Sequence, residues 1–471
     1  GAVFPKEPVY GSNNWYYAYG KSSHEEILRD SGFVSSLCTG NKNRPHMVID
    51  DGWEPHSVCG PWDRGNGRFP DMRRLAREMK DIGVSPGIWI RPLFDDSDFS
   101  AGKHCLEGAP HTLDVSDPAV LDYVKETVER IRYWGYTLIK HDFSSYDISG
   151  TFAAGRGMTY CGEGRHFANR SRTTAELAKD LYRTIYESAG AGEVTILGCN
   201  CINHLCVGYV HLNRSGDDTS GINWERTRRM GINALAFRLC QNEEFFRVDA
   251  DCVGLTAQVP WKKNRQWLDL LSRSGTPLFV SAEISNVSGE MKTALRKAFA
   301  RASVQKTGCE AVDWMENTCP AVWKFGDEVK TYNWDLPFGV ECDAWKGVCM
   351  KSMKMIICIL LVLWMLLPAA DVFADIDAGI VDLNKPERGT KCHVYDNGTV
   401  TYDAEEITQN DILGEDIAVT PGDTLTVAGI EGYRKTVILC YGNEGGELCK
   451  VMTVEQAESS RTTYMGTLIC D

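Results

Sequence analysis

Short apolar stretches alternate with amphipathic stretches from residue 10 to about residue 305. The apolar stretches are rich in β-branched and aromatic residues, which is typical of buried strands. We predict eight strands: "NNWYYAY" (13–19), "HMVID" (46–50), "VSPGIWI" (84–90), "YTLIKHD" (136–142), "VTILGCN" (194–200), "VGYVHLN" (207–213), "FFRVDAD" (245–251) and "PLFVSAE" (277–283). Helical periodicity occupies the intervals, most clearly at 71–83, 118–135 and 174–190. In the second of these helices Asp117 is the expected N-cap and Gly135 the expected end.

Eight strands that are each followed by a helix predict a closed (β/α)8 TIM barrel over residues 1–305. A doubly wound open sheet is the alternative, but no glycine-rich phosphate loop follows the first predicted strand. The active site of a barrel lies at the carboxyl ends of its strands. The polar residues at these ends are Asp50, Asp51, Arg91, Lys140, Asp142, Cys199, Arg214, Asp218, Asp249 and Asp251.

Lys140 and Asp142 lie two residues apart at the end of the fourth predicted strand. Residues i and i+2 of a strand share a face, so both should point into the barrel while His141 points away. A nearby ammonium group favours an ionised carboxylate, which a nucleophile requires. A purely structural ion pair between the two side chains is the alternative.

The stretch "HLNRSGDDTSG" (211–221) places Asp217 and Asp218 shortly after Arg214. A carboxyl group beside a like charge, or in a desolvated cleft, has a raised pKa and is suited to general acid catalysis. Capping of the following helix is the alternative role for one of the two residues. Asp50 and Asp51 end the second strand and are expected to accept hydrogen bonds from neutral hydroxyl groups.

Three tryptophans, Trp15, Trp53 and Trp89, lie at neighbouring strand ends, where they would form walls of a pocket. Each of them could equally be an ordinary core residue. Their shared location is the reason to consider them together.

The net charge of −14 argues against a nucleic-acid partner, because there is no surplus of cations to neutralise phosphates. Cysteines are scattered, and the Cys-x-Cys at 199 and 201 lacks a second pair at zinc spacing, so neither a metal nor another cofactor is expected. This distribution favours a reducing compartment, and we expect the barrel to be cytoplasmic. The chain begins with Gly, so its start is expected to be a fragment boundary.

Beyond residue 305 the pattern changes to β, and a hairpin with Gly326-Asp327 at its turn is predicted over 321–334. Residues 306–349 therefore resemble an incomplete C-terminal β-domain. Residues 350–374 combine lysines, an apolar run and Val-Phe-Ala, in the manner of a secretory signal peptide. Three interpretations are open: a junction between unrelated reading frames, a membrane anchor over 355–370, or a buried core segment. Residues 375–471 are expected to be a small β-rich domain of unknown function, exported if the apolar segment is genuine.

The stretches "NNWYYAYG", "IDDGW", "GIWIRP", "LIKHDFS", "RSGDDTSG" and "GTPLFVSAE" together resemble the melibiase-type α-galactosidases of glycoside hydrolase family 36 and, more distantly, family 27. The resemblance covers about residues 10–335, in the order and spacing of the family. It implies an exo-acting, retaining hydrolase of α-galactoside oligosaccharides that needs no cofactor. The sequence does not determine the oligomeric state, and a homo-oligomer stays open.

The resemblance also implies roles for single residues. Asp142 would be the nucleophile and Asp218 the acid/base. The remaining residues would bind the sugar: Asp50 and Asp51 at O4 and O6, Lys140 and Arg214 at ring hydroxyls, Trp15 at the apolar face and Cys199 beside C2. The retaining mechanism predicts a separation of about 5–5.5 Å between the two catalytic carboxyl groups.

The sequence departs from the family pattern at Arg91-Pro92-Leu93, where Pro-Glu-Met is common, and at "CNCINHLCVG" (199–208). Both stretches lie at the expected pocket rim. Activity on α-N-acetylgalactosamine or β-L-arabinopyranose therefore stays open as an alternative. A non-catalytic, membrane-tethered carbohydrate-binding barrel is the alternative outside enzymes.

Overall fold

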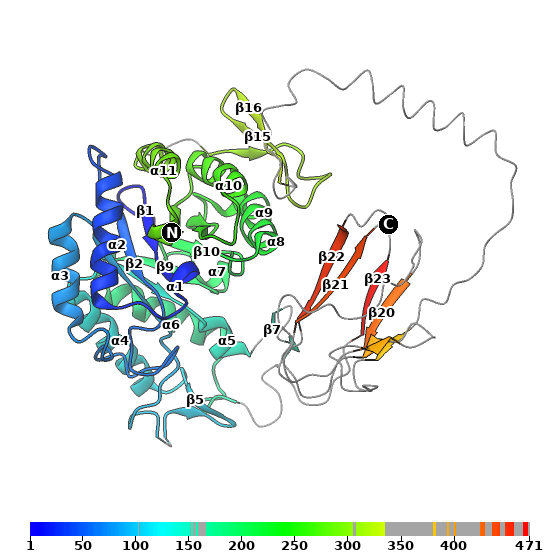
Figure 1. The fold of residues 1–471 in the computed structure, drawn as a ribbon. Coiled ribbons are helices and arrows are strands. Elements are labelled where there is room, and N and C mark those ends of the chain that lie inside the picture. The colour runs from blue at the N-terminus through cyan, green and yellow to red at the C-terminus, as the bar shows by residue number, and fades with distance from the viewer. Residues whose placement is uncertain are drawn as a thin grey trace, which may run out of the picture. The chain divides into compact units, whose positions relative to one another are not determined.

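The computed structural model describes residues 1–101, 103–150, 166–304 and 308–334 in full, and elsewhere only the backbone of short strands at 152–153, 157–158 and between 380 and 469. The chain divides into two compact units, Gly1–Glu341 and Cys342–Asp471. The first unit contains all of the strand-end residues considered above (Figure 1).

A nine-stranded parallel sheet forms the centre of the first unit, in the order β11-β10-β9-β6-β3-β2-β1-β13-β12. Its strands are β1 (Tyr10–Asn13), β2 (His46–Ile49), β3 (Ser85–Ile90), β6 (Leu138–His141), β9 (Thr195–Cys199), β10 (Leu212–Arg214), β11 (Arg247–Asp249), β12 (Cys252–Leu255) and β13 (Leu278–Ala282). The two edge strands, β11 and β12, are separated only by Ala250 and Asp251, so they are two halves of one strand. The chain itself therefore closes the sheet into the predicted TIM barrel.

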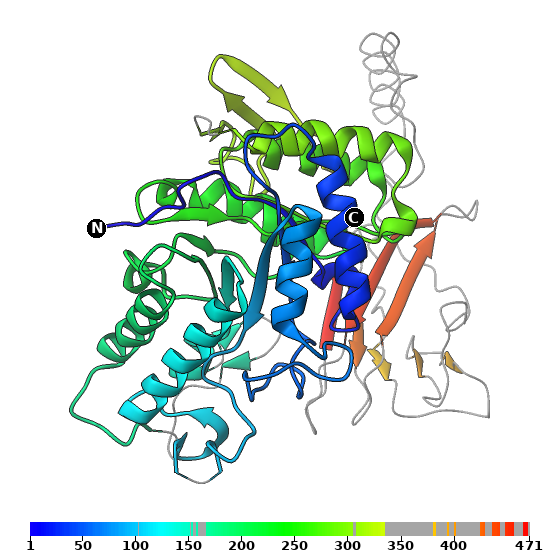
Figure 2. The ribbon, with the colours of Figure 1, turned by 90° about the vertical axis from the view of Figure 1, so that its left-hand side faces the viewer.

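Helices cover the outside of the barrel (Figures 1 and 2). The long ones are α2 (His24–Leu37), α3 (Met72–Ile82), α4 (Pro118–Trp134), α6 (Thr174–Ser188), α10 (Trp261–Arg273) and α11 (Gly289–Ala302). The 71–83, 118–135 and 174–190 helices are confirmed, and in α4 the side chain of Asp117 accepts from Ala119 N while Gly135 ends the helix at φ 101°. Shorter elements are α1 (Trp15–Ala18), β4 (Cys105–Leu106), β5 (Ala109–Leu113), α5 (Ser144–Ser149), β7 (Phe152–Ala153), β8 (Gly157–Met158), α7 (Asn203–Cys206), α8 (Trp224–Thr227), a π-helix (Arg228–Ile232), α9 (Asn233–Arg238) and 3-10 turns at Leu239–Gln241 and Ile284–Asn286.

Strand alternation produces two apolar clusters, one outside and one inside the barrel. Leu138, Leu197 and Leu212 belong to the small inner cluster, whereas the residues after Leu138 and before Leu197, Ile139 and Ile196, belong to the large outer one. Two residues further along the same strands lie Lys140, Cys199 and Arg214, which therefore face inward above the leucines. The barrel is filled by apolar side chains at its lower level and presents polar groups at its carboxyl end.

The first predicted strand is displaced, because "NNWYYAY" (13–19) is mostly not a strand. β1 ends at Asn13, whose side-chain oxygen accepts a hydrogen bond from Trp15 N at 2.8 Å, and residues 15–18 form the short helix α1. An asparagine that bonds to the backbone two residues ahead starts a turn and so ends the strand. Trp15 consequently lies in a helical turn at the barrel end.

The seventh strand contains an extra residue at Asp251. Asp249 and Cys252 both face inward although three positions separate them, and Asp251 adopts φ 70° between them. An extra residue of this kind bends a strand and redirects its side chains. Asp251 is thereby directed across the end of the barrel toward Tyr16 and Arg214.

The predicted hairpin is present as β15 (Val322–Phe325) and β16 (Glu328–Thr331), which form an antiparallel sheet with β14 (Glu310–Ala311). Residues 350–374 lie outside the described residues. In the second unit the described strands are β17 (Ile380–Asp382), β18 (His393–Val394), β19 (Val400–Thr401), β20 (Thr424–Ala428), β21 (Thr436–Gly442), β22 (Leu448–Glu455) and β23 (Met465–Ile469). They pair as β17-β20-β23, β18-β19 and β21-β22.

Gly52 is expected to be required where it follows Asp50 and Asp51. Its φ is +104°, and a Cβ there would lie 2.4 Å from the backbone oxygen of Gly20. We expect Gly52→Ala to lower the free energy of unfolding by about 2–4 kcal/mol, measured by urea denaturation. Gly40→Ala is the control: Gly40 has φ +88° but open space around it, so only backbone strain of about 1 kcal/mol applies. Equal losses in both variants would contradict the role of the close contact.

Candidate active site at the carboxyl end of the barrel

Asp142 follows β6 directly and is buried, with 7% of its surface exposed. Its Oδ1 accepts from Asn200 Nδ2 at 2.7 Å and from the backbone N–H of Phe143 at 2.7 Å. Its Oδ2 accepts from the indole N–H of Trp89 at 3.2 Å. Three N–H donors from β3, the end of β9 and its own loop thus hold this carboxylate in one orientation.

The sequence predicted that Lys140 would pair with Asp142, and this prediction of the partner is wrong. Lys140 Nζ donates instead to Asp50 Oδ2 at 2.7 Å, and Asn13 Nδ2 donates to the same oxygen at 2.6 Å. The sequence spacing placed Lys140 on the correct face, but β2 brings a second carboxylate within reach of the same ammonium group. Burial lowers the pKa of Lys140, but the charge of Asp50 opposes it and the net pKa is raised, so Lys140 stays cationic.

Asp51 lies beside a second buried carboxyl group, that of Glu54. The backbone N–H of Val58 lies 2.8 Å from Asp51 Oδ1 and 2.9 Å from Glu54 Oε1, so one donor bridges the two side chains. Burial, with the hydrogen bond and the charge of Asp51 adding to it, raises the pKa of Glu54 to about 9. Glu54 therefore carries a proton at neutral pH and supports Asp51 as a neutral donor.

The Glu54 proton makes a testable contribution to stability. The folded pKa of about 9 lies above the ordinary 4.5, so the associated stability is full below about pH 4.5 and is lost progressively as the pH rises toward 9. Glu54→Gln keeps a donor and does not titrate. We expect the variant to gain stability relative to wild type by more than about 1 kcal/mol between pH 5 and pH 8, measured by urea denaturation. A difference that is independent of pH would contradict this protonation state.

Arg214, the last residue of β10, is paired with Asp218 through Nη1. Burial raises the pKa of Asp218, but the charges of Arg214 and Lys140 lower it more, and the net pKa lies below the ordinary value. The raised pKa expected for this residue is therefore wrong for the ligand-free state, because Arg214, and not the neighbouring Asp217, dominates its surroundings. Asp218 is the more accessible carboxylate, with 38% of its side chain exposed.

Asp217 has a structural role, but not the helix cap that the sequence allowed for one of the pair, because the N-cap of α8 is Asn223, whose side chain accepts from Arg226 N. Its Oδ1 accepts from Asp218 N at 2.8 Å, and its other oxygen pairs with Arg226 Nη2 at 3.2 Å. Arg226 also donates to the backbone oxygen of Asp218 at 2.8 Å. Asp217 and Arg226 thus shape the loop that presents Asp218.

A further buried carboxylate, Asp251, accepts a hydrogen bond from Arg214. Its Oδ2 accepts from Tyr16 OH, from Thr219 N at 2.8 Å and from Arg214 Nη1 at 3.5 Å. Its backbone N–H donates to Asp249 Oδ1 at 2.9 Å, and burial together with the charge of Asp251 raises the pKa of Asp249 to about 6. Sequence reasoning placed both aspartates at the strand end but assigned them no role, because the partners of Asp251 come from α1, β10 and the loop after β10.

The aromatic residues and Cys199 differ in how deeply they are buried. Trp15 is half-buried over the inner cluster and makes an edge-to-face contact with Tyr19. Trp53 is completely buried, packs against Trp62 and donates to the backbone oxygen of Trp89, so it is a core residue and does not wall a pocket. Cys199 is fully buried beneath Asn200, whose Nδ2 lies 3.9 Å from its sulfur.

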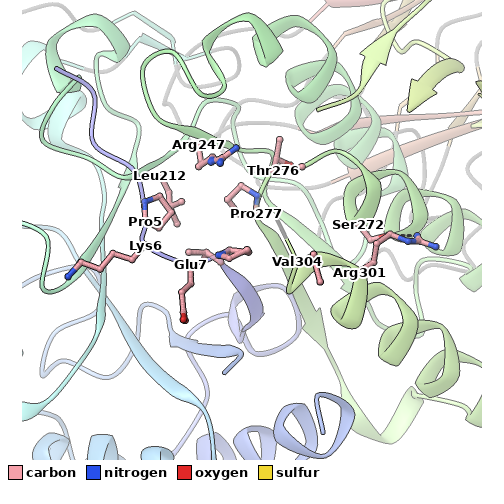
Figure 3. A pocket seen from close by; sticks show the side chains of 14 residues that line it. Pro5, Lys6, Glu7, Leu212, Arg247, Ser272, Thr276, Pro277, Arg301 and Val304 are labelled. Atoms are coloured by element: carbon pink, nitrogen blue, oxygen red, sulfur yellow. Dashed lines mark hydrogen bonds between the residues drawn. The ribbon is translucent and has the colours of Figure 1, made fainter. Parts of the chain in front are cut away.

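The opposite end of the barrel contains two hollows. A cavity of about 50 Å³ there is lined by Pro5, Lys6 and Glu7 together with Leu212 and Arg247, the first residues of β10 and β11 (Figure 3). A larger hollow of about 560 Å³ adjoins the start of β2, β3, β6 and β9. Because barrel active sites lie at the carboxyl ends of strands, these hollows are not candidate active sites.

Three further properties hold for the described ranges. No group of three or more His, Cys, Asp and Glu side chains is placed to hold a metal ion. None of the described helices has both the length and the apolar character needed to cross a bilayer. The ten described cysteines have free thiols.

No protein-family model matches this chain. TtGalA, an α-galactosidase from Thermus thermophilus solved with p-nitrophenyl α-D-galactopyranoside, is 21% identical and has a TM-score of 0.55 over 70% of this chain and 67% of that one. AgaA, a GH36 α-galactosidase from Geobacillus stearothermophilus solved with stachyose, gives 16% identity and a TM-score of 0.48 over 68% and 45%. Abp, a GH27 β-L-arabinopyranosidase from the same organism, is 14% identical and has a TM-score of 0.49 over 65% of this chain and 78% of that one. The likeness to TtGalA shows that the chain shares the barrel fold of that structure.

Proposed function

We propose that this chain is a retaining glycoside hydrolase that releases terminal α-linked galactose from oligosaccharides. The observation that carries the proposal is a pair of carboxylates, Asp142 and Asp218, at the same end of the barrel but in different surroundings. Asp142 is buried and fixed by three N–H donors, whereas Asp218 is more exposed and its carboxylate pairs with Arg214. Two carboxyl groups with distinct environments are what a double displacement requires.

In the first step Asp142 attacks the anomeric carbon while Asp218 gives its proton to the departing glycosidic oxygen. In the second step Asp218 takes a proton from water, the water oxygen bonds to the anomeric carbon, and the bond to Asp142 breaks. The free protein holds Asp218 ionised beside Arg214, so Asp218 takes up its proton as the sugar enters. A sugar hydroxyl that accepts from Arg214 would weaken that ion pair and permit protonation.

The surrounding groups suit a polyhydroxylated ring. Asp50 and Lys140 form a buried acceptor and donor pair at the ends of β2 and β6, and Asp51 supplies a second acceptor backed by Glu54. Trp15 offers a half-buried aromatic face at the opening. Galactose is the sugar that the sequence resemblance implies for this arrangement, and the fold shared with TtGalA is consistent with it.

The full-length chain tests the proposal with p-nitrophenyl α-galactoside, the matching α-N-acetylgalactosaminide and p-nitrophenyl β-L-arabinopyranoside. We expect the highest kcat/KM on the α-galactoside and an α-anomer as the first product by NMR. A β-anomer as the first product would refute retention. A higher kcat/KM on either other sugar would move the assignment to that glycoside, and saturable galactose binding without hydrolysis would support a non-catalytic barrel instead.

A further inference from the structure

Asn200 lies where the sequence departs from the resemblance, directly after β9, and no role follows for it from the motifs. It is half-buried and adopts φ 55°, a left-handed conformation that asparagine tolerates better than most residues. This conformation turns its side chain back over Cys199, and Nδ2 reaches Asp142 Oδ1 at 2.7 Å. The contact joins two strand ends that are 58 residues apart in the chain.

The two oxygens of Asp142 are unequally occupied. Oδ1 accepts two short hydrogen bonds, both of 2.7 Å, from Asn200 and from Phe143 N. Oδ2 accepts one longer bond of 3.2 Å from Trp89. Each carboxylate oxygen has about two lone-pair sites, so those of Oδ1 are filled while Oδ2 keeps one for another atom.

We propose that Asn200 is a positioning residue that makes Oδ2 the attacking oxygen and Oδ1 the carbonyl oxygen of the glycosyl ester. This inference rests on the proposed retaining mechanism. When the ester breaks, the bond between the anomeric carbon and Oδ2 gives its electron pair back to the carboxylate, water bonds to the anomeric carbon, and Asp218 takes the proton of that water. The returning negative charge spreads onto Oδ1, where the amide of Asn200 stabilises it.

The mechanism predicts an unequal effect on the two steps. In the first step the carboxylate starts fully charged and loses charge, so removal of a donor to Oδ1 costs little. In the second step the ester is neutral and charge develops on Oδ1, so removal of the donor slows ester breakdown. Loss of Asn200 should therefore cause the glycosyl–Asp142 ester to accumulate.

Asn200→Gly tests this, because glycine adopts the same positive φ and removes only the side chain. On p-nitrophenyl α-galactoside we expect kcat to fall about 10- to 100-fold, KM to fall by a similar factor, and a burst of nitrophenol equal to the enzyme concentration. Mass spectrometry of the quenched reaction should show a mass increase of one galactosyl group on the peptide containing Asp142. Asn200→Asp keeps the size and the backbone conformation but replaces the donor by an acceptor, and should slow ester breakdown at least as much.

The outcomes separate this inference from the proposed function. If the wild-type chain is active and Asn200→Gly has the same kcat and KM, the inference is overturned while the proposed function stands. A variant with raised KM, lowered kcat and no burst would also overturn it, because that pattern reports only a damaged loop. A wild-type chain that releases no nitrophenol from p-nitrophenyl α-galactoside would overturn the proposed function and the inference with it. Unchanged urea denaturation midpoints would confirm that the variants are folded.

Discussion

Replacement of Asp142 by alanine is expected to lower kcat on p-nitrophenyl α-galactoside by about 10⁴-fold or more, since no other described carboxylate shares its three donors. Asp142→Ala leaves a small space where the carboxylate stood. Azide should enter this space and restore part of the activity, with β-galactosyl azide as the product detected by NMR. An azide product of this anomeric form arises only if Asp142 attacked the anomeric carbon from the β face.

The matched control is Asp122→Ala, because Asp122 is exposed on helix α4 outside the barrel. This variant should keep wild-type kcat and KM. Retention of wild-type activity by Asp142→Ala would refute the assignment of Asp142 as the nucleophile. Failure of azide to restore any activity to Asp142→Ala would argue against a small-anion site at that position. Asp142→Asn, which keeps the shape but not the charge, should be as inactive as Asp142→Ala in the absence of azide.

Replacement of Asp218 by alanine should affect substrates according to their leaving groups. For an unactivated disaccharide, kcat/KM should fall about 10²- to 10⁴-fold, because a poor leaving group needs the proton. For the nitrophenyl galactoside the first step should slow much less, and slow hydrolysis of the ester should produce a burst. Equal losses of kcat/KM on both substrates would contradict the acid/base assignment of Asp218.

The pH dependence of the wild-type chain should report the ion pair between Arg214 and Asp218. Burial raises the pKa of Asp218, but Arg214 and Lys140 lower it further, so the free protein protonates this group only below its ordinary pKa. The kcat/KM for an unactivated substrate reflects the free enzyme. Because the general acid must be protonated, the decline of kcat/KM with rising pH should therefore begin at low pH. The decline of kcat with rising pH should begin at higher pH, because bound sugar competes for Arg214 and so raises the pKa of Asp218 in the complex. Identical limbs in the two profiles would show that the ion pair persists in the complex.

Much of the site could be predicted locally. Strand alternation is set by the backbone, so the inward direction of Lys140 was predicted from its place on the strand, and Leu138 two residues earlier lies in the inner cluster. The helices could be predicted equally well, because an N-cap such as Asp117 and a C-terminal glycine such as Gly135 act within one helical turn. The helix-capping role offered for one of Asp217 and Asp218 was wrong, because Asn223, which lies closer to the helix, is the N-cap of α8.

The partners of these residues could not be predicted, because they come from distant parts of the chain. Lys140 bonds to Asp50, 90 residues away, since β2 and β6 flank β3 in the sheet and their inward ends meet. Asn200 and Asp251 reach the site through left-handed backbone positions that no periodicity reveals. By itself the sequence determined which residues stand at the carboxyl ends of the barrel strands, because that depends on local periodicity. Which carboxylate each cation holds, and which oxygen of Asp142 stays open, was decided only by the closure of the barrel, because closure sets the distances between strand ends.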